Sequence, residues 1–451
     1  MSDTTKKIRK SLSADSLFRM AREQFDHLPD SRPANTKIPL GDALMSGFAM
    51  FSLKDPSLLL FDQRRNNPSD NFRSVFHIGR VPSDSQMRDI LDPVDPDSLR
   101  PIFTEVFRRL QRGKALEDLA YLDGRYLISL DGTTYFSSSK IHCDSCLEKH
   151  HRNGSVTYSH QMLGASLVHP DHKEVIPLTP EPIINQDGHT KNDCERNATR
   201  RWLERFRQEH PQLPVIIVED GLAANAPHLT DIKNANARYI IRVKEGDHAF
   251  LFKHLREADE AGATKYLSEI DSDTGILHHY RYHQAVPLNE SNQDTLVNVL
   301  EYWEIHPDTI VKKTPCKGKI QYFSWITDFE LRADTVYDIM RGGRARWKIE
   351  NETFNTLKNQ GYHAEHNYGH GKQNLSVVLM YLMMLAFLVD QTQQLCCPLF
   401  QAAWKKMGSK RHLWEELRHF FRVFLFTSMS ELLTAIICGI QMQAPVLANT
   451  S

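Results

Sequence analysis

Two short apolar runs that each end in Asp-Gly constrain the fold of this chain more than any other feature of its sequence. The first occupies 125–132 and the second 215–221. Between them, 191–209 has apolar residues at helical spacing. A second helical pattern lies around 222–234, between strand-like runs at 214–219 and 238–243. Because a helix between two runs rich in Val and Ile indicates a crossover connection, we predict part of a parallel sheet. Further strand-like runs at 156–168 and 173–178 suit antiparallel pairing, so the predicted fold class is α/β, a mixed sheet with helices on its faces.

Three acidic residues have distinctive places in this pattern. Asp131 follows the first run, Asp220 follows the second, and Glu350 lies within a helical pattern at 332–359. An acidic side chain beside a buried strand is costly unless a cation pairs with it. Ligands of open α/β sheets gather at the carboxyl ends of strands, and Mg²⁺ prefers oxygen ligands. If the three acids converge, they would hold divalent metal, and paired metals of this kind catalyse displacement at phosphorus.

Each acid also has a plain structural interpretation. Asp131 and Asp220 could be the first residues of Asp-Gly turns. Glu350 could form an i,i+4 pair with Arg346, worth about 0.3–0.5 kcal/mol. Against this, Trp347 and the apolar residues that follow it pattern as buried, which would pack the helix on both sides of Glu350.

By composition the chain divides into five segments, and its 451 residues are too many for one small core. We expect, in order, a helical N-terminal region, the first part of a mixed-sheet core, a β-rich insertion or sheet extension, core helices carrying Glu350, and a C-terminal helical region. Their boundaries are 1–119, 120–245, 246–330, 331–395 and 396–451.

The formal net charge of −1 gives no global basic field of the kind that indicates nucleic-acid binding. Local basic clusters occur instead, although each by itself has the plain interpretation of a solvated helix face. They lie at 6–10, 108–114, 200–207, 341–348 and 405–411.

Seven cysteines in a chain of this length do not describe a disulfide framework. The first 22 residues are polar and charged, so we expect no signal peptide. The most apolar run, 377–389, is shorter than the ~20 residues of a membrane helix. We therefore predict a buried helix there and a cytoplasmic protein without a membrane span.

A Cys-x2-Cys pair, Cys143 and Cys146, lies among several histidines and has the spacing of zinc ligands. A structural zinc could take Cys194 as a third thiolate and His151 as the fourth ligand. The alternative histidines are His142 and His150. Because the chain has no second Cys-x2-Cys, plain reduced cysteines remain an alternative, and a redox pair is a third.

The segments around the three acids resemble the DDE transposases of bacterial insertion sequences. These segments are Asp-Gly-Thr-Thr-Tyr-Phe-Ser from Asp131, Val-Glu-Asp-Gly-Leu around Asp220, and Arg-Trp-Lys-Ile-Glu-Asn-Glu-Thr-Phe-Asn-Thr-Leu-Lys around Glu350. The resemblance covers roughly 120–395. It implies a ribonuclease-H-like core in which the three acids bind two Mg²⁺ or Mn²⁺ ions. It also implies DNA cleavage at element ends followed by strand transfer, and 246–330 is similar to a β-rich insertion found in some members.

The same resemblance implies terminal inverted repeats and target DNA as partners, and we expect a homodimer in the active DNA complex. The helical region 1–119, which carries the basic cluster at 6–10, would bind the element end. Arg346, Lys348 and Lys358 would contact DNA near Glu350.

One departure concerns the motif Tyr-x2-Arg-x3-Glu-x6-Lys, which related transposases carry around the catalytic Glu. Arg346 and Glu350 fit it, but Gly343 replaces the Tyr and Lys358 comes one residue late. Strand handling, including any hairpin intermediate, is therefore left open. A nuclease of the same fold, a DNA-binding protein without catalysis, and a zinc-dependent redox or scaffold protein are the alternative functions.

Overall fold

The computed structural model describes residues 10–33, 35–65, 70–185, 193–311 and 314–439. Most of the basic cluster at 6–10 lies outside these residues. The chain forms two compact units. The helical unit comprises Met1–Ala115, Tyr135–Cys146 and Asn355–Ser451, and the sheet unit comprises Leu116–Thr134 and Leu147–Phe354.

The helical unit is built from helices at both ends of the sequence. They are η1 (Lys10–Leu12), α1 (Ala14–Asp26), α2 (Leu40–Ser52), α3 (Leu58–Arg65), α4 (Asn71–Ser74), α5 (Asp84–Leu91), η2 (Pro96–Leu99), α6 (Arg100–Arg112), α11 (Asn355–Asn359), α12 (Leu375–Cys396), α13 (Pro398–Met407), α14 (Lys410–Val423) and α15 (Met429–Cys438).

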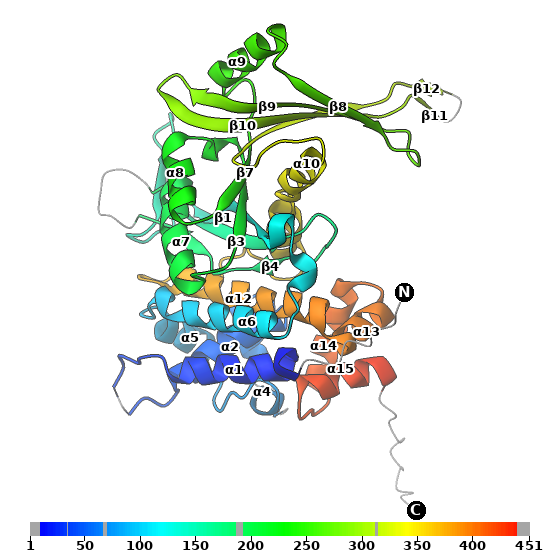
Figure 1. The fold of residues 1–451 in the computed structure, drawn as a ribbon. Coiled ribbons are helices and arrows are strands. Elements are labelled where there is room, and N and C mark those ends of the chain that lie inside the picture. Colours follow the sequence, from blue (N-terminus) through cyan, green and yellow to red (C-terminus); the bar gives the residue numbers. More distant parts are fainter. Residues whose placement is uncertain (1–9, 34, 66–69, 186–192, 312–313, 440–451) are drawn as a thin grey trace, which may run out of the picture. The chain divides into compact units, whose positions relative to one another are not determined.

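Two helices that are buried on all sides form the centre of this unit. Every residue of α2 is buried, and so is every residue of α12 except the last two. The two helices pack against each other, and α1, α5 and α6 surround them (Figure 1). α12 has the length and hydropathy of a membrane span, but its apolar window is fully buried inside the protein. Its surroundings are therefore those of a core helix.

The sheet unit contains the remaining elements. They are η3 (Glu117–Leu119), η4 (Leu122–Gly124), β1 (Tyr126–Ser138), β2 (Leu147–His150), β3 (Val156–Val168), β4 (Ile176–Pro177), β5 (Glu181–Ile183), α7 (Glu195–Glu209), β6 (Val215–Glu219), η5 (Gly221–Ala223), α8 (Ala226–Asn234), β7 (Arg238–Arg242), α9 (Ala249–Glu260), β8 (Lys265–Ile270), β9 (Leu277–Asn289), β10 (Asn292–Ile305), β11 (Thr309–Val311), β12 (Thr314–Cys316), β13 (Ile320–Thr327), α10 (Val336–Ala345) and the π-helix η6 (Ile349–Phe354).

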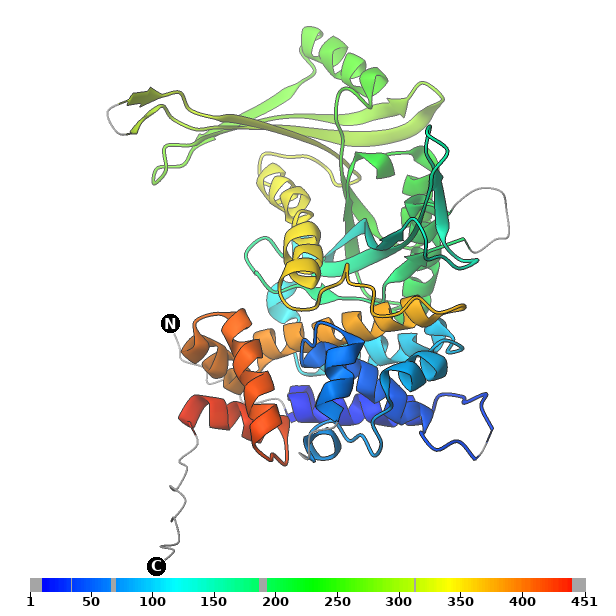
Figure 2. The same cartoon turned by 180° about the vertical axis from the view of Figure 1, so that it is seen from behind.

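One large mixed sheet organises this unit, with the strand order β2-β3-β1-β6-β7-β13-β10-β9-β8. β1, β6 and β7 are parallel neighbours, and the strands from β13 onward are antiparallel. α7 and α8 cover one face near β6 and β7, and α10 covers the other face (Figures 1 and 2). The α/β fold class predicted from the sequence, a mixed sheet flanked by helices, is thereby confirmed.

Two local expectations from the sequence are wrong. β1 does not end at Asp131 but continues to Ser138, so this acid lies within a strand instead of beyond it. Trp347, expected to be buried, is 60 % exposed. The backbone changes from α10 to the π-helix η6 close to this residue, and that change alters which side chains face the sheet.

Candidate active site

Asp131 and Asp220 are brought together by the register of two parallel strands. β1 and β6 pair from Tyr126 with Val215 to Ser129 with Val218. Continuing the same register two residues further places Asp131 beside Asp220. Neighbouring strands lie about 4.8 Å apart, so this register brings the two acids close together where β6 ends, and the charge of Asp220 acts on Asp131.

The Asp131 carboxylate is held in a half-buried position that favours its neutral form. It accepts a hydrogen bond from the Gly132 backbone N–H at 3.0 Å. Burial raises the pKa of Asp131 to about 6; the nearby Arg346 charge opposes this shift, and the charges of Glu350 and Asp220 add to it. Both other acids therefore lie close enough to act on Asp131 through space.

The two successive acids at the end of β6 have different surroundings. Glu219 is buried and accepts a hydrogen bond from His228 at 2.6 Å. Asp220 begins the turn η5 and accepts the backbone N–H of Leu222 at 3.0 Å. Since Glu219 is already paired with His228, Asp220, which directly follows β6, is the acid here that could hold a metal.

Glu350 lies on the short π-helix η6, which is anchored to the sheet. The hydroxyl groups of Thr353 and of Ser166 in β3 form a hydrogen bond of 3.0 Å. Phe354 covers Gly164 so closely that a Cβ on this glycine would come within 2.6 Å of its ring. Glycine at this position of β3 therefore permits the close approach of η6 to the sheet.

Arg346 links this helix to the strand that carries Asp131. Its guanidinium donates to Glu350 at 2.6 Å and lies 3.7 Å from an Asp131 oxygen. Its backbone carbonyl accepts a hydrogen bond from Ser129 at 3.0 Å. One cation therefore sits against two of the three predicted acids.

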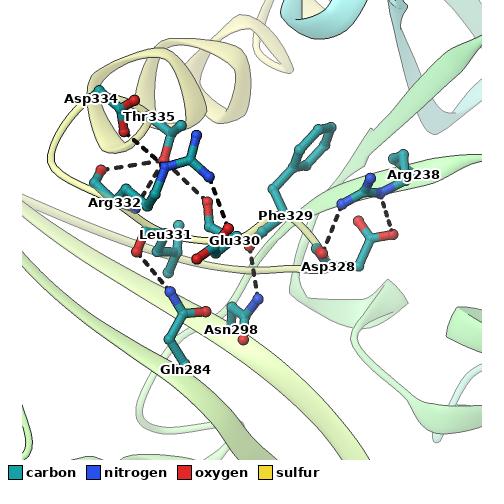
Figure 3. A network of polar contacts seen from close by, with 10 residues as sticks. All are labelled: Arg238, Gln284, Asn298, Asp328, Phe329, Glu330, Leu331, Arg332, Asp334 and Thr335. Carbon is teal, nitrogen blue, oxygen red and sulfur yellow. Dashed lines mark hydrogen bonds and ion pairs between the residues drawn. The ribbon is translucent and has the colours of Figure 1, made fainter.

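The segment that leads from β13 into α10 is fixed by polar contacts with three strands (Figure 3). Arg238 of β7 donates to Asp328 at 2.6 Å and stacks on the ring of Phe329. Asn298 of β10 and Gln284 of β9 donate to the backbone carbonyls of this segment, at Phe329 and Leu331 respectively. Because these bonds set where α10 begins, the β-rich strands help to place the helices that precede Glu350.

A fourth acid, Glu195, was missed from the sequence. It opens α7, and its carboxylate occupies the space that a side chain on residue 132 would need. Burial raises the pKa of Glu195 to about 7, and the charges of Asp131 and Asp220 add to the shift. Acidic residues are common in the first turn of a helix, where they interact favourably with the helix dipole. The sequence therefore gives no signal that Glu195 has any other role.

The predicted DNA contacts have unequal surroundings. Lys348 donates to the backbone carbonyl of His172 at 2.6 Å, and burial lowers its pKa. Lys358 belongs to the helical unit and pairs with Glu365 at 2.9 Å. Among the three, Arg346 alone contacts predicted acids within the described part of the chain.

Packing explains the glycine at position 343, where the motif of related transposases has tyrosine. Gly343 of α10 lies against the indole of Trp325 in β13, and a Cβ at this position would overlap the indole nitrogen. Trp325 is fully buried. A tyrosine at 343 therefore cannot be accommodated without moving Trp325.

The two cysteines of the Cys-x2-Cys pair lie in the helical unit, and their surroundings differ from the expected ligand set. Cys143 and Cys146 group with His370, with ligand atoms within 4.8 Å of one another. Neither His151 nor Cys194 belongs to this group. His151 bonds to Thr157 at 2.8 Å, and Cys194 is exposed at the start of α7.

Comparison with known proteins supplies the family. None of the curated proteins matches the chain. The family model of the transposase DDE domain matches residues 128–388, which is more than half of the chain and includes all three predicted acids. This chain therefore belongs to the transposase DDE domain family.

Proposed function

We propose that this protein cleaves phosphodiester bonds at the ends of a mobile DNA element and joins those ends to target DNA, with Asp131, Asp220 and Glu350 as ligands of two Mg²⁺ ions. One observation chiefly supports the proposal. Arg346 contacts both Glu350 and Asp131, while the charge of Asp220 acts on Asp131. Three acids from two strands and a helix thus share one small region.

The chemistry of these residues fits divalent metal. A single cation, Arg346, lies against this group of three carboxylates, and the pKa of Asp131 is raised first by its burial and further by the charges of Glu350 and Asp220. Mg²⁺ or Mn²⁺ in this position would supply the missing positive charge and polarise the phosphate and the attacking oxygen. The three acids would hold the metal ions as ligands. Arg346 would fix the orientation of Glu350. Glu195 would be a further ligand or a proton acceptor beside Asp131.

We propose that the N-terminal helices bind the element end, as the sequence predicts. Exposed basic side chains are present on α6, among them Arg108 and Arg112. The helices from η1 to α6 belong to the same unit as α12 and several of them pack against it, so they are part of the helical unit and not a separate domain. We propose terminal inverted repeats and target DNA as the partners, a homodimer as the active complex, and the cytoplasm as the place of action.

The decisive experiment uses conservative changes of the acids in the full chain. Asp131→Asn, Asp220→Asn and Glu350→Gln each keep the shape of the side chain and remove its charge. The substrate is labelled duplex DNA taken from the sequences that flank the coding region, with Mg²⁺ or Mn²⁺. We expect cleavage and strand transfer to fall by about a thousandfold or more in each variant, because a lost ligand removes transition-state stabilisation of several kcal/mol. DNA binding should persist.

Glu257→Gln is the matched control, because Glu257 is an exposed acid on α9 that pairs with Lys253. It should cleave like the parent protein. Metal-dependent cleavage that survives in Glu350→Gln would contradict the ligand assignment. Cleavage by the parent protein without joining to target DNA would instead identify a nuclease of this family.

A further inference from the structure

Three side chains from two distant segments of the helical unit converge on one point. The Sγ atoms of Cys143 and Cys146 are 3.9 Å apart. The Nε2 atom of His370 lies 3.5 Å from the Cys146 Sγ atom, although the two residues are 224 positions apart in sequence. Cys146 and His370 are buried, and Cys143 is half-buried.

These separations match the edges of a tetrahedral zinc site. With Zn–S bonds of ~2.3 Å and a Zn–N bond of ~2.0–2.1 Å, tetrahedral angles place two sulfurs ~3.8 Å apart and a sulfur and nitrogen ~3.6 Å apart. The observed 3.9 and 3.5 Å agree with both edges. A disulfide, in contrast, requires about 2.05 Å between the sulfurs, much less than the 3.9 Å between these two.

The histidine is held in place independently of the cysteines. Its ring packs on Phe136 with centroids 4.3 Å apart. Just after His370, Asp92 accepts the backbone N–H groups of Lys372, Gln373 and Leu375 at 2.9–3.0 Å. The loop before α12 is therefore fixed at the residues that follow His370. This holds the histidine with its Nε2 atom toward the sulfurs.

The cysteines are arranged by their own short turn. The Cys146 backbone N–H donates to the Cys143 carbonyl at 3.1 Å. The Cys143 backbone N–H in turn donates to the Cys146 sulfur at 3.4 Å. N–H donors directed at a sulfur stabilise the thiolate form that binds metal.

We propose that Cys143, Cys146 and His370 bind a structural Zn²⁺ ion. The fourth position of the tetrahedron would be taken by water or by a further side chain. The ion would tie the segment after β1 to the loop before α12 and so stabilise the helical unit. This inference is independent of the function proposed for the three acids.

The test is the metal content of the full chain, purified without chelator and measured by mass spectrometry of the elements. We expect about one zinc per chain, the stoichiometry of a single structural site. Cys143→Ser and His370→Ala should each lower the zinc content about tenfold or more. Cys194→Ser and His151→Ala are the matched controls, because these residues were the ligands expected from the sequence, and both should retain the metal.

A second measurement covers the case in which a ligand variant fails to fold. Replacing zinc by Co²⁺ in the parent protein should give the intense visible absorption of tetrahedral cobalt and a thiolate charge-transfer band. Parent protein with only traces of zinc and no such bands on cobalt addition would overturn the proposal. Full zinc content in folded Cys143→Ser or His370→Ala would overturn it as well.

Discussion

Lys54 gives the sharpest test of what holds the helical unit together. It lies two residues after the end of α2, and its side chain is fully buried. Its Nζ atom lies 2.5 Å from an Asp390 oxygen on α12 and above the rings of Tyr362 and Trp414, at 4.2 and 4.3 Å from their centroids. Tyr362 also donates its hydroxyl hydrogen to Asp390. Burial lowers the pKa of Lys54, and Asp390 opposes that shift.

We expect Lys54→Met to lower the free energy of unfolding by about 3–5 kcal/mol, since removing one partner of a buried ion pair leaves the other charge uncompensated. The two lost cation–π contacts, about 0.5–2 kcal/mol each, put the loss near the upper end. Adding Asp390→Asn removes the stranded charge but keeps an acceptor for Tyr362. The double variant should therefore lie within about 1–2 kcal/mol of the parent, which makes the two changes strongly non-additive.

The assay is urea unfolding of the full chain, followed by circular dichroism and by tryptophan fluorescence, because the two units need not unfold together. The control is Lys358→Met, which breaks a partly exposed pair with Glu365 in the same unit and should cost less than about 1 kcal/mol. The reasoning fails if Lys54→Met costs no more than this control. It fails equally if the double variant loses the sum of the two single losses.

Two further predictions concern the acids and the DNA. In metal-free protein, the raised pKa values of Asp131 (about 6) and Glu195 (about 7) mean that the folded state keeps protons that the unfolded state releases. The free energy of unfolding should therefore fall as the pH rises from about 4 to 7. Urea titrations at several pH values should show a smaller fall in Glu195→Gln than in the parent protein. An equal fall in the two proteins would refute this prediction. Arg108→Ala and Arg112→Ala should each weaken binding to element-end DNA and reduce the slope of log affinity against log salt by about one, as fluorescence anisotropy at several salt concentrations would show. Unaltered slopes would place the end-binding surface elsewhere.

Much of the sheet could be predicted because its strands have apolar, β-branched sequences. The expected strand 156–168 coincides with β3, and the expected run at 214–219 differs from β6 by one residue. β9 was not predicted, because its sequence is rich in histidine and its burial depends on pairing with β10, far from any local pattern. The Asp-Gly after the first run predicts the end of a strand, although β1 continues through it.

The candidate sites divide in the same way. Asp131 and Asp220 could be paired from sequence because each follows an apolar run at an equivalent position in a parallel register. Glu195 and His370 could not be found, since each meets its neighbours only through tertiary structure. His370 lies in a loop between helices, and no spacing rule connects it with Cys146, 224 positions away.

The pairing of α2 with α12 has a consequence for synthesis on the ribosome. α2 ends at Ser52, and its partner begins only at Leu375. At ~5–20 residues per second, the ribosome needs about 20–60 s to make the intervening segment. Throughout that interval the nascent chain carries an apolar helix whose partner does not yet exist. The helical unit must therefore fold after translation is nearly complete, and a chaperone that shields α2 during elongation would raise the yield of native protein.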